Sequence, residues 1–334
     1  MYSPVRNPHR LVSLVVALLV AVGVAPRLAA QNPPTATGPI PRAEALLREG
    51  RIEDAELLLN KHVASQPNDG KAWLFLGRIY LDAAHTWHTT GHPGASGPIL
   101  LDFATQTIEQ AQQLLTDSGS VFRVVVEVER ATNRIEELGW ARGVAVAISA
   151  EDLPLPPVLR EFGRNLIASC PDRGVLVTGG LVESTAAWGS RLLANFRSDL
   201  IIVRPDLYAT DPRYRAQMAL AIGADSSTGL AAALAQAGAK RPICLSPTLG
   251  SLAVPPLVWH PMRLALVAGR LGDADNTTPM SVSQLARTGL VGSVWATPTR
   301  DLYNLAAVRN PSLCTSLFVK PDAQGLPTIP ACFP

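Results

Sequence analysis

Apolar residues in the first half of the chain recur at the spacing of helix faces, which divides this half into paired helices. Residues 42–67 predict one pair. A second pair is expected to contain residues 73–80 in its first helix and residues 100–115 in its second. Between these two helices, residues 85–98 are expected to form an inserted loop, and residues 121–138 predict a further helix.

The second half of the chain changes to short apolar runs that alternate with helical patterns. Residues 175–178, 199–203 and 241–245 are continuous apolar runs of the length that buried strands have. Helical patterns and short turns separate these runs, so we expect a parallel sheet with right-handed crossovers. Residues 264–268 are a candidate for one more strand.

The first 41 residues precede the predicted helices and have the composition of an export signal followed by a linker. Two arginines stand before an apolar run at 11–25, which is shorter than the roughly 20 residues of a membrane span. Small residues follow, so residues 1–30 are predicted to be a signal peptide cleaved before Gln31, and residues 31–41 a Pro-rich linker. An uncleaved N-terminal anchor is the alternative. Both interpretations place the body of the protein outside the cytoplasm, in the periplasm or secreted.

Charge and composition narrow the classes of partner. The chain has 29 basic and 27 acidic residues, and residues 1–30 hold three of the arginines and no acid, which leaves a net charge of −1 on the rest. A near-neutral body gives no electrostatic case for nucleic acid. No later segment approaches a membrane span, so we expect no membrane insertion after signal cleavage. With 47% hydrophobic and 17% charged residues, a disordered chain is excluded.

The four cysteines lie in the second half, and an even number in an exported chain permits disulfides in three pairings. A bridge from Cys314 to Cys332 would fix a Pro-rich end of the chain. Cys170 and Cys244 lie at the edges of predicted α/β elements, where buried thiols are an equal alternative. The absence of a C-x-x-C pair argues against a thioredoxin-like redox role.

A recognisable repeat pattern occupies the second predicted helix pair. It reads W-x-x-L-G-x-x-Y with small residues in the following helix, at Trp73, Leu76, Gly77, Tyr80, Ala104 and Ala111. This pattern resembles a tetratricopeptide (TPR) unit, in which small residues let paired helices approach and the larger ones fill the seam. The resemblance implies a non-enzymatic binding or assembly module with a protein partner in the cell envelope.

Taken together, these patterns predict an α/β protein with two domains. TPR-like helical hairpins are expected over residues 42–142, and a Rossmann-like parallel α/β domain over residues 150–334.

The turn after the first predicted strand is the candidate small-ligand site. It contains Thr178, Gly179, Gly180, Glu183 and Ser184 at the start of a helix, where glycines and helix N–H groups suit an anion or sugar hydroxyls. No G-x-G-x-x-G or P-loop motif is present. A tight strand-to-helix turn with a helix cap is the alternative interpretation.

A second resemblance covers residues 172–245, which are similar to the soluble region of bacterial protein O-mannosyltransferase-like membrane proteins. The matching residues are Thr178, Gly180, Trp188, Arg197 and Asp199. The first acid of that pattern is Leu181 here, and the second is at best Glu183. The membrane-embedded catalytic part is absent, so glycosyl transfer does not carry over. The resemblance implies an alternative function, an accessory protein of cell-surface glycosylation that binds a glycan or glycosyl donor at residues 178–184.

Other chemistry has weaker support in the sequence. His85, His88 and His92 have a spacing that suits zinc or copper on one helix face, although a solvated loop is the simpler interpretation. Trp87, in the same insertion, is expected to pack on the core rather than to serve as a ligand platform. The glutamates at 127, 129, 136 and 137 predict a solvated helix face. No complete catalytic motif occurs, and the sequence predicts no cofactor.

Overall fold

The computed structural model describes residues 38–90, 96–146, 148–149, 152–194, 196–250, 254, 256–270, 280–318 and 325–333. Residues Gly38–Pro334 form one compact unit. The predicted signal peptide and most of the predicted linker lie outside the described residues. None of the helices described is long and apolar enough to cross a membrane.

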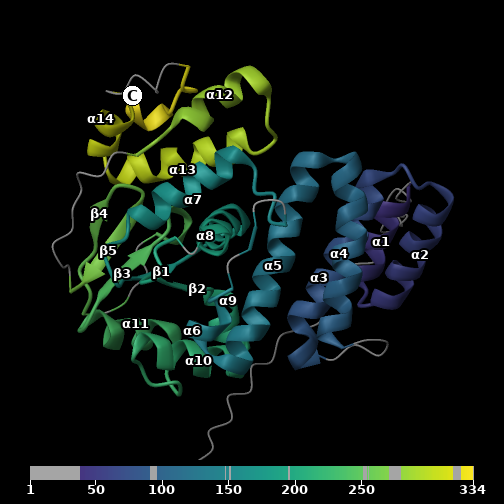
Figure 1. The fold of residues 1–334 in the computed structure, drawn as a ribbon, viewed down its shortest axis with the longest axis horizontal. Helices are drawn as coiled ribbons and strands as arrows, with labels where there is room; N and C mark the ends of the chain where they lie inside the picture. Colours follow the sequence, from purple (N-terminus) through teal and green to yellow (C-terminus); the bar gives the residue numbers. More distant parts are fainter. Residues whose placement is uncertain are drawn as a thin grey trace, which may run out of the picture. The chain divides into compact units, whose positions relative to one another are not determined.

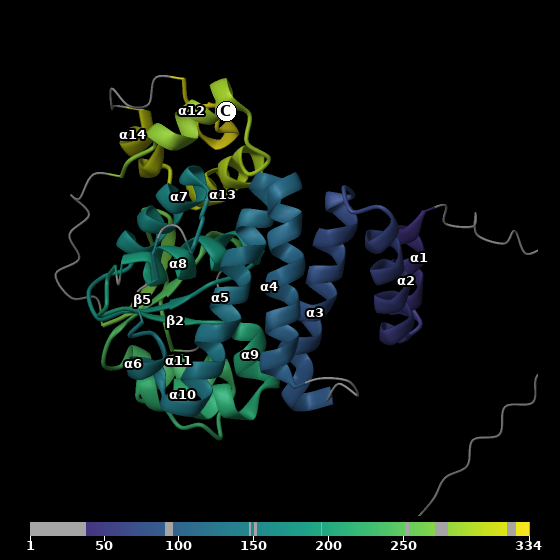
Figure 2. The ribbon, with the colours of Figure 1, turned by 45° about the vertical axis from the view of Figure 1, so that its right-hand side comes forward.

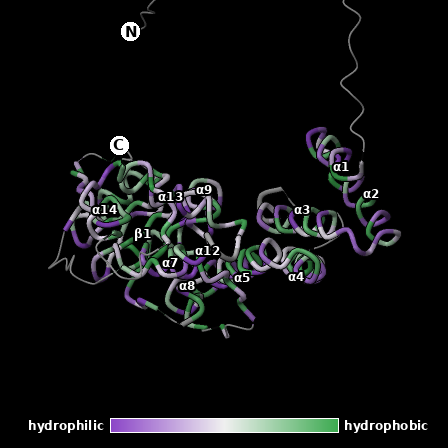
Figure 3. The backbone as a smooth tube through the Cα atoms, turned by 90° about the horizontal axis from the view of Figure 1, so that it is seen from above, coloured by the Kyte–Doolittle hydropathy of each residue, from purple (hydrophilic) through white to green (hydrophobic). Residues whose placement is uncertain are grey.

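The first half of the chain is helical, as its periodicity predicts (Figure 1). The long helices are α1 Pro39–Arg48, α2 Ile52–Ser65, α3 Gly70–Thr90, α4 Gly97–Leu114 and α5 Thr116–Leu138, followed by α6 Trp140–Gly143 and α7 Pro157–Ala168. Asp69 caps α3, because its Oδ1 accepts a hydrogen bond from the backbone N–H of Ala72 at 3.1 Å. The helices carry both hydrophobic and hydrophilic residues along their length (Figure 3), as expected for helices that pack on one face.

The strands of the second half form one mixed five-stranded sheet. They are β1 Val175–Val177, β2 Ile201–Val203, β3 Pro242–Leu245, β4 His260–Met262 and β5 Ala265–Gly269, in the order β2-β1-β3-β5-β4. The strand β1 pairs in parallel with both β2 and β3, as predicted, whereas β5 is antiparallel to β3 and to β4. The prediction of a wholly parallel sheet is therefore wrong at one edge. There β4 and β5 form a hairpin that turns at Arg263, which has a φ of 50°.

Helices cover both faces of this sheet (Figures 1 and 2). The helices α7 and α8 lie on one face, and α10 and α11 on the other. The bounds are α8 Leu181–Ala194, α9 Pro205–Thr210, α10 Pro212–Ile222, α11 Leu230–Gly238, α12 Ser283–Val291, α13 Ala296–Arg309 and α14 Ser312–Phe318, with 3₁₀ turns at Pro247–Leu249 and Pro330–Cys332. The structure is thus a helix-rich α/β fold.

Two hydrophobic clusters make up the core, and helix α5 contributes to both. Val124 and Val128 of α5 belong to the larger cluster around the sheet, whereas Val126 belongs to the smaller cluster of the first four helices. Opposite faces of one helix are therefore buried against different partners, so α5 has few solvent-exposed positions in its middle. The predicted domain boundary between residues 142 and 150 stays a prediction.

The repeat-pattern residues lie in the packed seam between α3 and α4. Leu76, Ala104 and Ala111 are fully buried, and Tyr80 is 9% exposed. A Cβ atom on Gly77 would lie 2.5 Å from Cγ1 of Ile108, so only glycine permits this close approach of the two helices.

Trp73 differs from the prediction that it fills this seam, because it is only partly buried. It lies in the first turn of α3, and its Nε1 donates a hydrogen bond to the backbone oxygen of Pro67 at 2.8 Å. The indole therefore stays at the end of the helix, where one part of it faces solvent.

The predicted inserted loop is partly helical, because α3 continues to Thr90. His85, Trp87 and His88 consequently lie on this helix. Trp87 packs on the smaller cluster, and a Cβ on Gly97 would lie 3.3 Å from its ring. The expected packing of Trp87 on the core is confirmed. Residues 91–95 lie outside the described residues.

The four cysteines form two disulfides, which selects one of the three possible pairings. Cys170 bonds to Cys244 and Cys314 bonds to Cys332, with Cα–Cα distances of 5.8 and 5.4 Å. The first bridge joins the turn before β1 to β3 in the core, so the alternative of buried thiols at these positions is wrong. The second bridge anchors the C-terminal segment to α14, as expected.

The burial of Leu76 predicts a large effect of its truncation on stability. Leu76→Ala removes a side chain from the α3–α4 seam and is expected to lower the free energy of unfolding by about 2–5 kcal/mol. Leu57→Ala is the matched control, because Leu57 is a helical leucine with 64% exposure, and it is expected to cost less than about 0.5 kcal/mol. Urea unfolding followed by circular dichroism measures both. Equal losses would contradict the packing described.

Candidate functional site

A cavity of about 370 Å³ lies at the carboxyl ends of β1 and β2. Its walls are formed by α5, the turn between β1 and α8, the first turns of α8 and the segment that follows β2. The lining residues are Val125, Val128, Glu129, Thr178, Gly179, Gly180, Leu181, Ser184, Thr185, Arg204, Pro205 and Asp206. Ligands of open α/β sheets gather at this edge, because the carboxyl ends of parallel strands meet there.

Close packing further along α8 explains why the cavity forms at its N-terminal end. A Cβ atom on Gly189 would lie 3.1 Å from Cγ1 of Val124, so α8 and α5 are in direct contact there. At the start of α8, small and polar side chains replace this contact. The space between the two helices remains unfilled by the described side chains at that end.

Hydroxyl groups line the α8 side of the cavity. Thr178 and Thr185 are 1% and 2% exposed, and Ser184 is half-buried. The Oγ1 of Thr178 donates a long hydrogen bond of 3.4 Å to Oγ of Ser184. Thr185 lines the cavity too, and its hydroxyl is not one of the fully buried side-chain atoms that lack a partner in the described part of the chain. Thr178 and Ser184, which the sequence predicts as ligand-binding residues, are thus brought together at the cavity.

Glu183, the remaining acidic candidate from the sequence, has a different position. It is fully buried and does not line the cavity. Its carboxylate accepts hydrogen bonds from the backbone N–H of Thr248 at 2.8 Å, from the hydroxyl of Ser246 at 3.0 Å and from the hydroxyl of Thr248. Burial raises the pKa of Glu183, and the hydrogen bonds from Thr248 and Ser246 oppose this shift. Glu183 therefore holds the turn after β3, and both of its carboxylate oxygens are already hydrogen-bonded there.

The two glycines of the turn have different constraints. The backbone N–H of Gly179 donates to Oγ of Ser246 at 2.8 Å, and a Cβ on Gly179 would lie 2.0 Å from Oγ1 of Thr248. Glycine is therefore required at 179 by the close approach of the turn after β3. A Cβ on Gly180 would meet no atom of the described residues within 4 Å, although the Gly180 N–H donates to Oγ1 of Thr248 at 3.3 Å. Position 180 thus has open space beside it.

The opposite wall of the cavity contains a buried ion pair that the sequence analysis missed. The guanidinium of Arg204 donates to the carboxylate of Glu129 at 2.5 Å and to Asp206 at 3.3 Å. The side chains of Arg204 and Glu129 are 12% and 8% exposed. His85 lies 3.4 Å from Glu129 and 3.9 Å from Asp206. The prediction that Glu129 belongs to a solvated helix face is therefore wrong.

A signal for this ion pair was present in the sequence. Arg204 follows a buried strand directly, and Glu129 stands among the valines of α5 at the spacing of their buried face. A charge at either position needs a partner, because an unpaired buried charge is very costly.

Arg204, Glu129, Asp206 and His85 form a charged cluster. Its charges shift the pKa values of Glu129 and His85. Burial alone would raise the pKa of Glu129, but Arg204 and His85 together hold it below its ordinary value. The hydrogen bond to Glu129 raises the pKa of His85 above its ordinary 6.5. Glu129 is therefore ionised beside Arg204 at neutral pH, and the charged form of His85 is favoured beside them.

A second concave surface lies on the first helices. This groove, with a volume of about 540 Å³, is formed by α2, α3 and α4. Aromatic and amide-bearing side chains line it together with one hydroxyl and one carboxylate, at Asn60, Trp73, Tyr80, Phe103, Gln106, Thr107, Glu109 and Gln110. Trp73 and Tyr80 of the repeat pattern thus reach a surface, whereas Leu76, Gly77, Ala104 and Ala111 are internal.

The histidine cluster predicted from the sequence provides no metal site in the part of the chain that is described. Within that part, no group of three His, Cys, Asp or Glu side chains is placed to hold a metal ion. His85 contacts Glu129 instead, and His92 lies outside the described residues.

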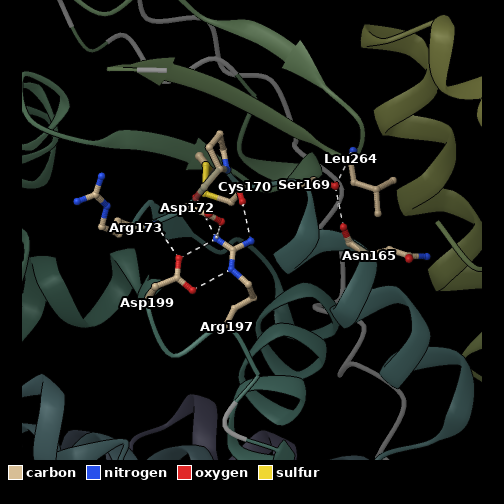
Figure 4. The surroundings of a disulfide bond; sticks show 10 residues. Asn165, Ser169, Cys170, Asp172, Arg173, Arg197, Asp199 and Leu264 are labelled. Atoms are coloured by element: carbon tan, nitrogen blue, oxygen red, sulfur yellow. Dashed lines mark hydrogen bonds and ion pairs between the residues drawn. A yellow bond between two sulfur atoms is a disulfide. The ribbon is translucent and has the colours of Figure 1, made fainter. Parts of the chain in front are cut away.

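Two residues of the glycosyltransferase-like pattern have a structural role (Figure 4). Arg197 donates to both carboxylate oxygens of Asp199 at 2.9 Å, and to the backbone oxygens of Cys170 and Pro171 at 3.0 and 3.1 Å. Arg197 has a φ of 53°, and it lowers the pKa of Asp199 to about 2. This clamp joins the turns that lead into β1 and β2, beside the Cys170–Cys244 disulfide.

No family model, curated protein or solved structure matches this chain.

The raised pKa of His85 predicts a pH dependence of stability. The charged form of His85 is favoured in the folded protein, so its stabilisation is fully present below a pH of about 6.5 and is lost as the pH rises through the raised value. We expect the free energy of unfolding to fall more between about pH 6 and pH 8 in the wild type than in His85→Gln.

Urea unfolding at several pH values measures this difference. Glu136, whose pKa burial raises to about 7, titrates in the same range in both proteins, so the difference between them isolates His85. If the free energy of unfolding changes with pH in the same way in the wild type and in His85→Gln, the charge of His85 does not stabilise the folded protein.

Proposed function

We propose that this protein is a non-enzymatic binding module that holds a segment of a partner protein in the groove of α2, α3 and α4. The observation that carries the proposal is the groove itself, in which aromatic rings and amide groups share one concave surface. Binding sites for peptide segments combine apolar anchors with groups that pair with backbone N–H and C=O. The groove offers both kinds of group.

Exposed apolar side chains extend this surface along α4. Ile99, Phe103 and Leu114 are 47%, 42% and 41% exposed, and their spacing places them on one face of the helix with Gln106 and Gln110. The ring of Phe103 packs against Tyr80 with a centroid distance of 5.4 Å. An apolar side chain of a partner segment would lie against these rings, whereas its backbone would face the glutamine amides.

We infer that the helix pairs α1–α2 and α3–α4 are TPR-like hairpins and that the region around β1, β2 and β3 is Rossmann-like. Gly77 at the α3–α4 crossing supports the first inference. The order β2-β1-β3, with parallel pairing and intervening helices, supports the second. An array with few hairpins needs a second surface on which to bury its last helix. In this chain α5 packs against α8 and α10.

The proposed place of action is outside the cytoplasm. The two disulfides support this proposal, because such bonds persist in oxidising compartments. The N-terminal signal pattern points to the same location. The partner is accordingly a protein of the cell envelope.

The alternative of a glycosylation accessory placed glycan binding at residues 178–184, which include Glu183. Both oxygens of that carboxylate accept hydrogen bonds from Ser246 and Thr248. We therefore do not propose Glu183 as a ligand-binding residue.

The proposal predicts a site-specific crosslink in the native cell. A photoreactive phenylalanine analogue at position 103 is expected to capture one discrete envelope protein, because this position lies in the groove. The same analogue at position 220 is the matched control, since Leu220 is an exposed helical residue, 77% exposed, outside the groove. It is expected to give no such adduct.

A second substitution makes this result specific to the groove. Adding Trp73→Ala to the position-103 protein removes a groove ring and is expected to abolish the adduct in a protein that thermal melting shows to be folded. No adduct at position 103, or the same adduct at both positions, would refute the proposed binding surface.

A further inference from the structure

The cavity at the ends of β1 and β2 is lined by residues that do not belong to the groove of α2, α3 and α4. Its chemistry is unlike that of a protein-docking surface, because buried hydroxyls and a buried ion pair line it. The question is which small molecule complements this set of groups.

The buried hydroxyls indicate a ligand that forms hydrogen bonds. Thr185 is 2% exposed and lines the cavity, so its hydroxyl is available to a molecule bound there. Thr178 and Ser184 share only one hydrogen bond of 3.4 Å. Buried polar groups are normally hydrogen-bonded, and an unmet group costs free energy. Each of these hydroxyls can both donate and accept.

The charges of the cavity indicate that this ligand is uncharged. Arg204 is paired with Glu129 and Asp206, and His85 lies beside both carboxylates. The guanidinium of Arg204 and the imidazole of His85 therefore already face both carboxylates. A phosphate, a carboxylate or an amine placed there would meet no unpaired opposite charge, and its desolvation would be uncompensated.

The remaining wall is apolar and limits the size of the ligand. Val125 and Val128 of α5 face the cavity together with Leu181 and Pro205. A volume of about 370 Å³ lies near the lower end of the range for small-molecule sites. It suits one ring with its substituents and excludes a long chain.

We propose that this cavity binds one uncharged polyhydroxylated molecule of about monosaccharide size. Its hydroxyl groups pair with Thr178, Ser184 and Thr185 on one side and with Asp206 on the other, where the Asp206 side chain is 56% exposed. Its C–H groups lie against the valines of α5. Hydroxyls match this site because they donate and accept without adding charge. The proposal assigns no catalytic step.

Calorimetric titration with a defined set of probes tests the proposal. The uncharged probes are glucose, galactose, mannose, N-acetylglucosamine and myo-inositol, and the charged probes are glucose 6-phosphate, glucuronic acid and glucosamine. Saturable binding of at least one uncharged probe to the wild type is expected. The charged probes are expected to bind at least tenfold more weakly than that probe.

Two variants locate the binding in the cavity. Gly180→Phe places a ring in the open space beside residue 180 and is expected to abolish binding. Gly229→Phe is the matched control, because Gly229 also precedes a helix and also has no atom near its would-be Cβ, yet it lies outside the cavity. It is expected to bind as the wild type does. Thr185→Val keeps the shape of the side chain and is expected to weaken binding about fivefold, the loss of one hydrogen bond.

Each result of the titration either supports or contradicts the proposal. Thermal melting first establishes that each variant is folded. The proposal is overturned if no uncharged probe binds the wild type, if a charged probe binds more tightly, or if Gly180→Phe and Gly229→Phe bind equally well. The proposal is supported if Gly180→Phe abolishes binding, Thr185→Val weakens it and Gly229→Phe leaves it unchanged.

Discussion

The buried ion pair between Glu129 of α5 and Arg204 at the end of β2 is the interaction on which this structure depends most. Neither charge is tolerable alone, because each side chain is about nine-tenths buried. The pair therefore ties α5 to the edge of the sheet where ligands of α/β folds bind. Since α5 packs in both hydrophobic clusters, this contact also relates the first helices to the sheet. The cavity exists because α5 is held at that edge.

The space at this edge lies on one side of β1 because the chain fills the other side itself. Glu183, Ser246 and Thr248 occupy the crevice between the turns after β1 and β3, and they satisfy the N–H groups of the glycine turn. A ligand cannot use those groups without displacing the hydroxyls of Ser246 and Thr248, which the Glu183 carboxylate holds in place. The open side faces α5, where small hydroxyl side chains and Gly180 leave space. The cavity and the groove on α2–α4 are thus separate surfaces with different chemistry.

Local patterns in the sequence predicted most of the elements but not the contacts that join them. The apolar runs at 175–178, 199–203 and 241–245 became β1, β2 and β3, because such runs are buried wherever they lie. The antiparallel edge was not predictable, since nothing local specifies the partner of β5. The site was half predicted. Thr178 and Ser184 line the cavity, but the role of Glu129 depends on Arg204, which is 75 residues away. Trp73 matched the repeat pattern, but it is only partly buried because it lies in the first turn of α3.

A double-mutant cycle on Glu129→Gln and Arg204→Gln is the most direct test of this account. Free energies of unfolding of the wild type, both single variants and the double variant give the coupling between the two side chains. Each single variant leaves the other buried charge with only its weaker partner, Asp206 for Arg204 or His85 for Glu129, and is expected to cost up to about 3–5 kcal/mol. The double variant should cost clearly less than the sum, with a coupling of at least about 2 kcal/mol. A coupling below about 0.5 kcal/mol would mean that the pair does not hold α5 at the sheet.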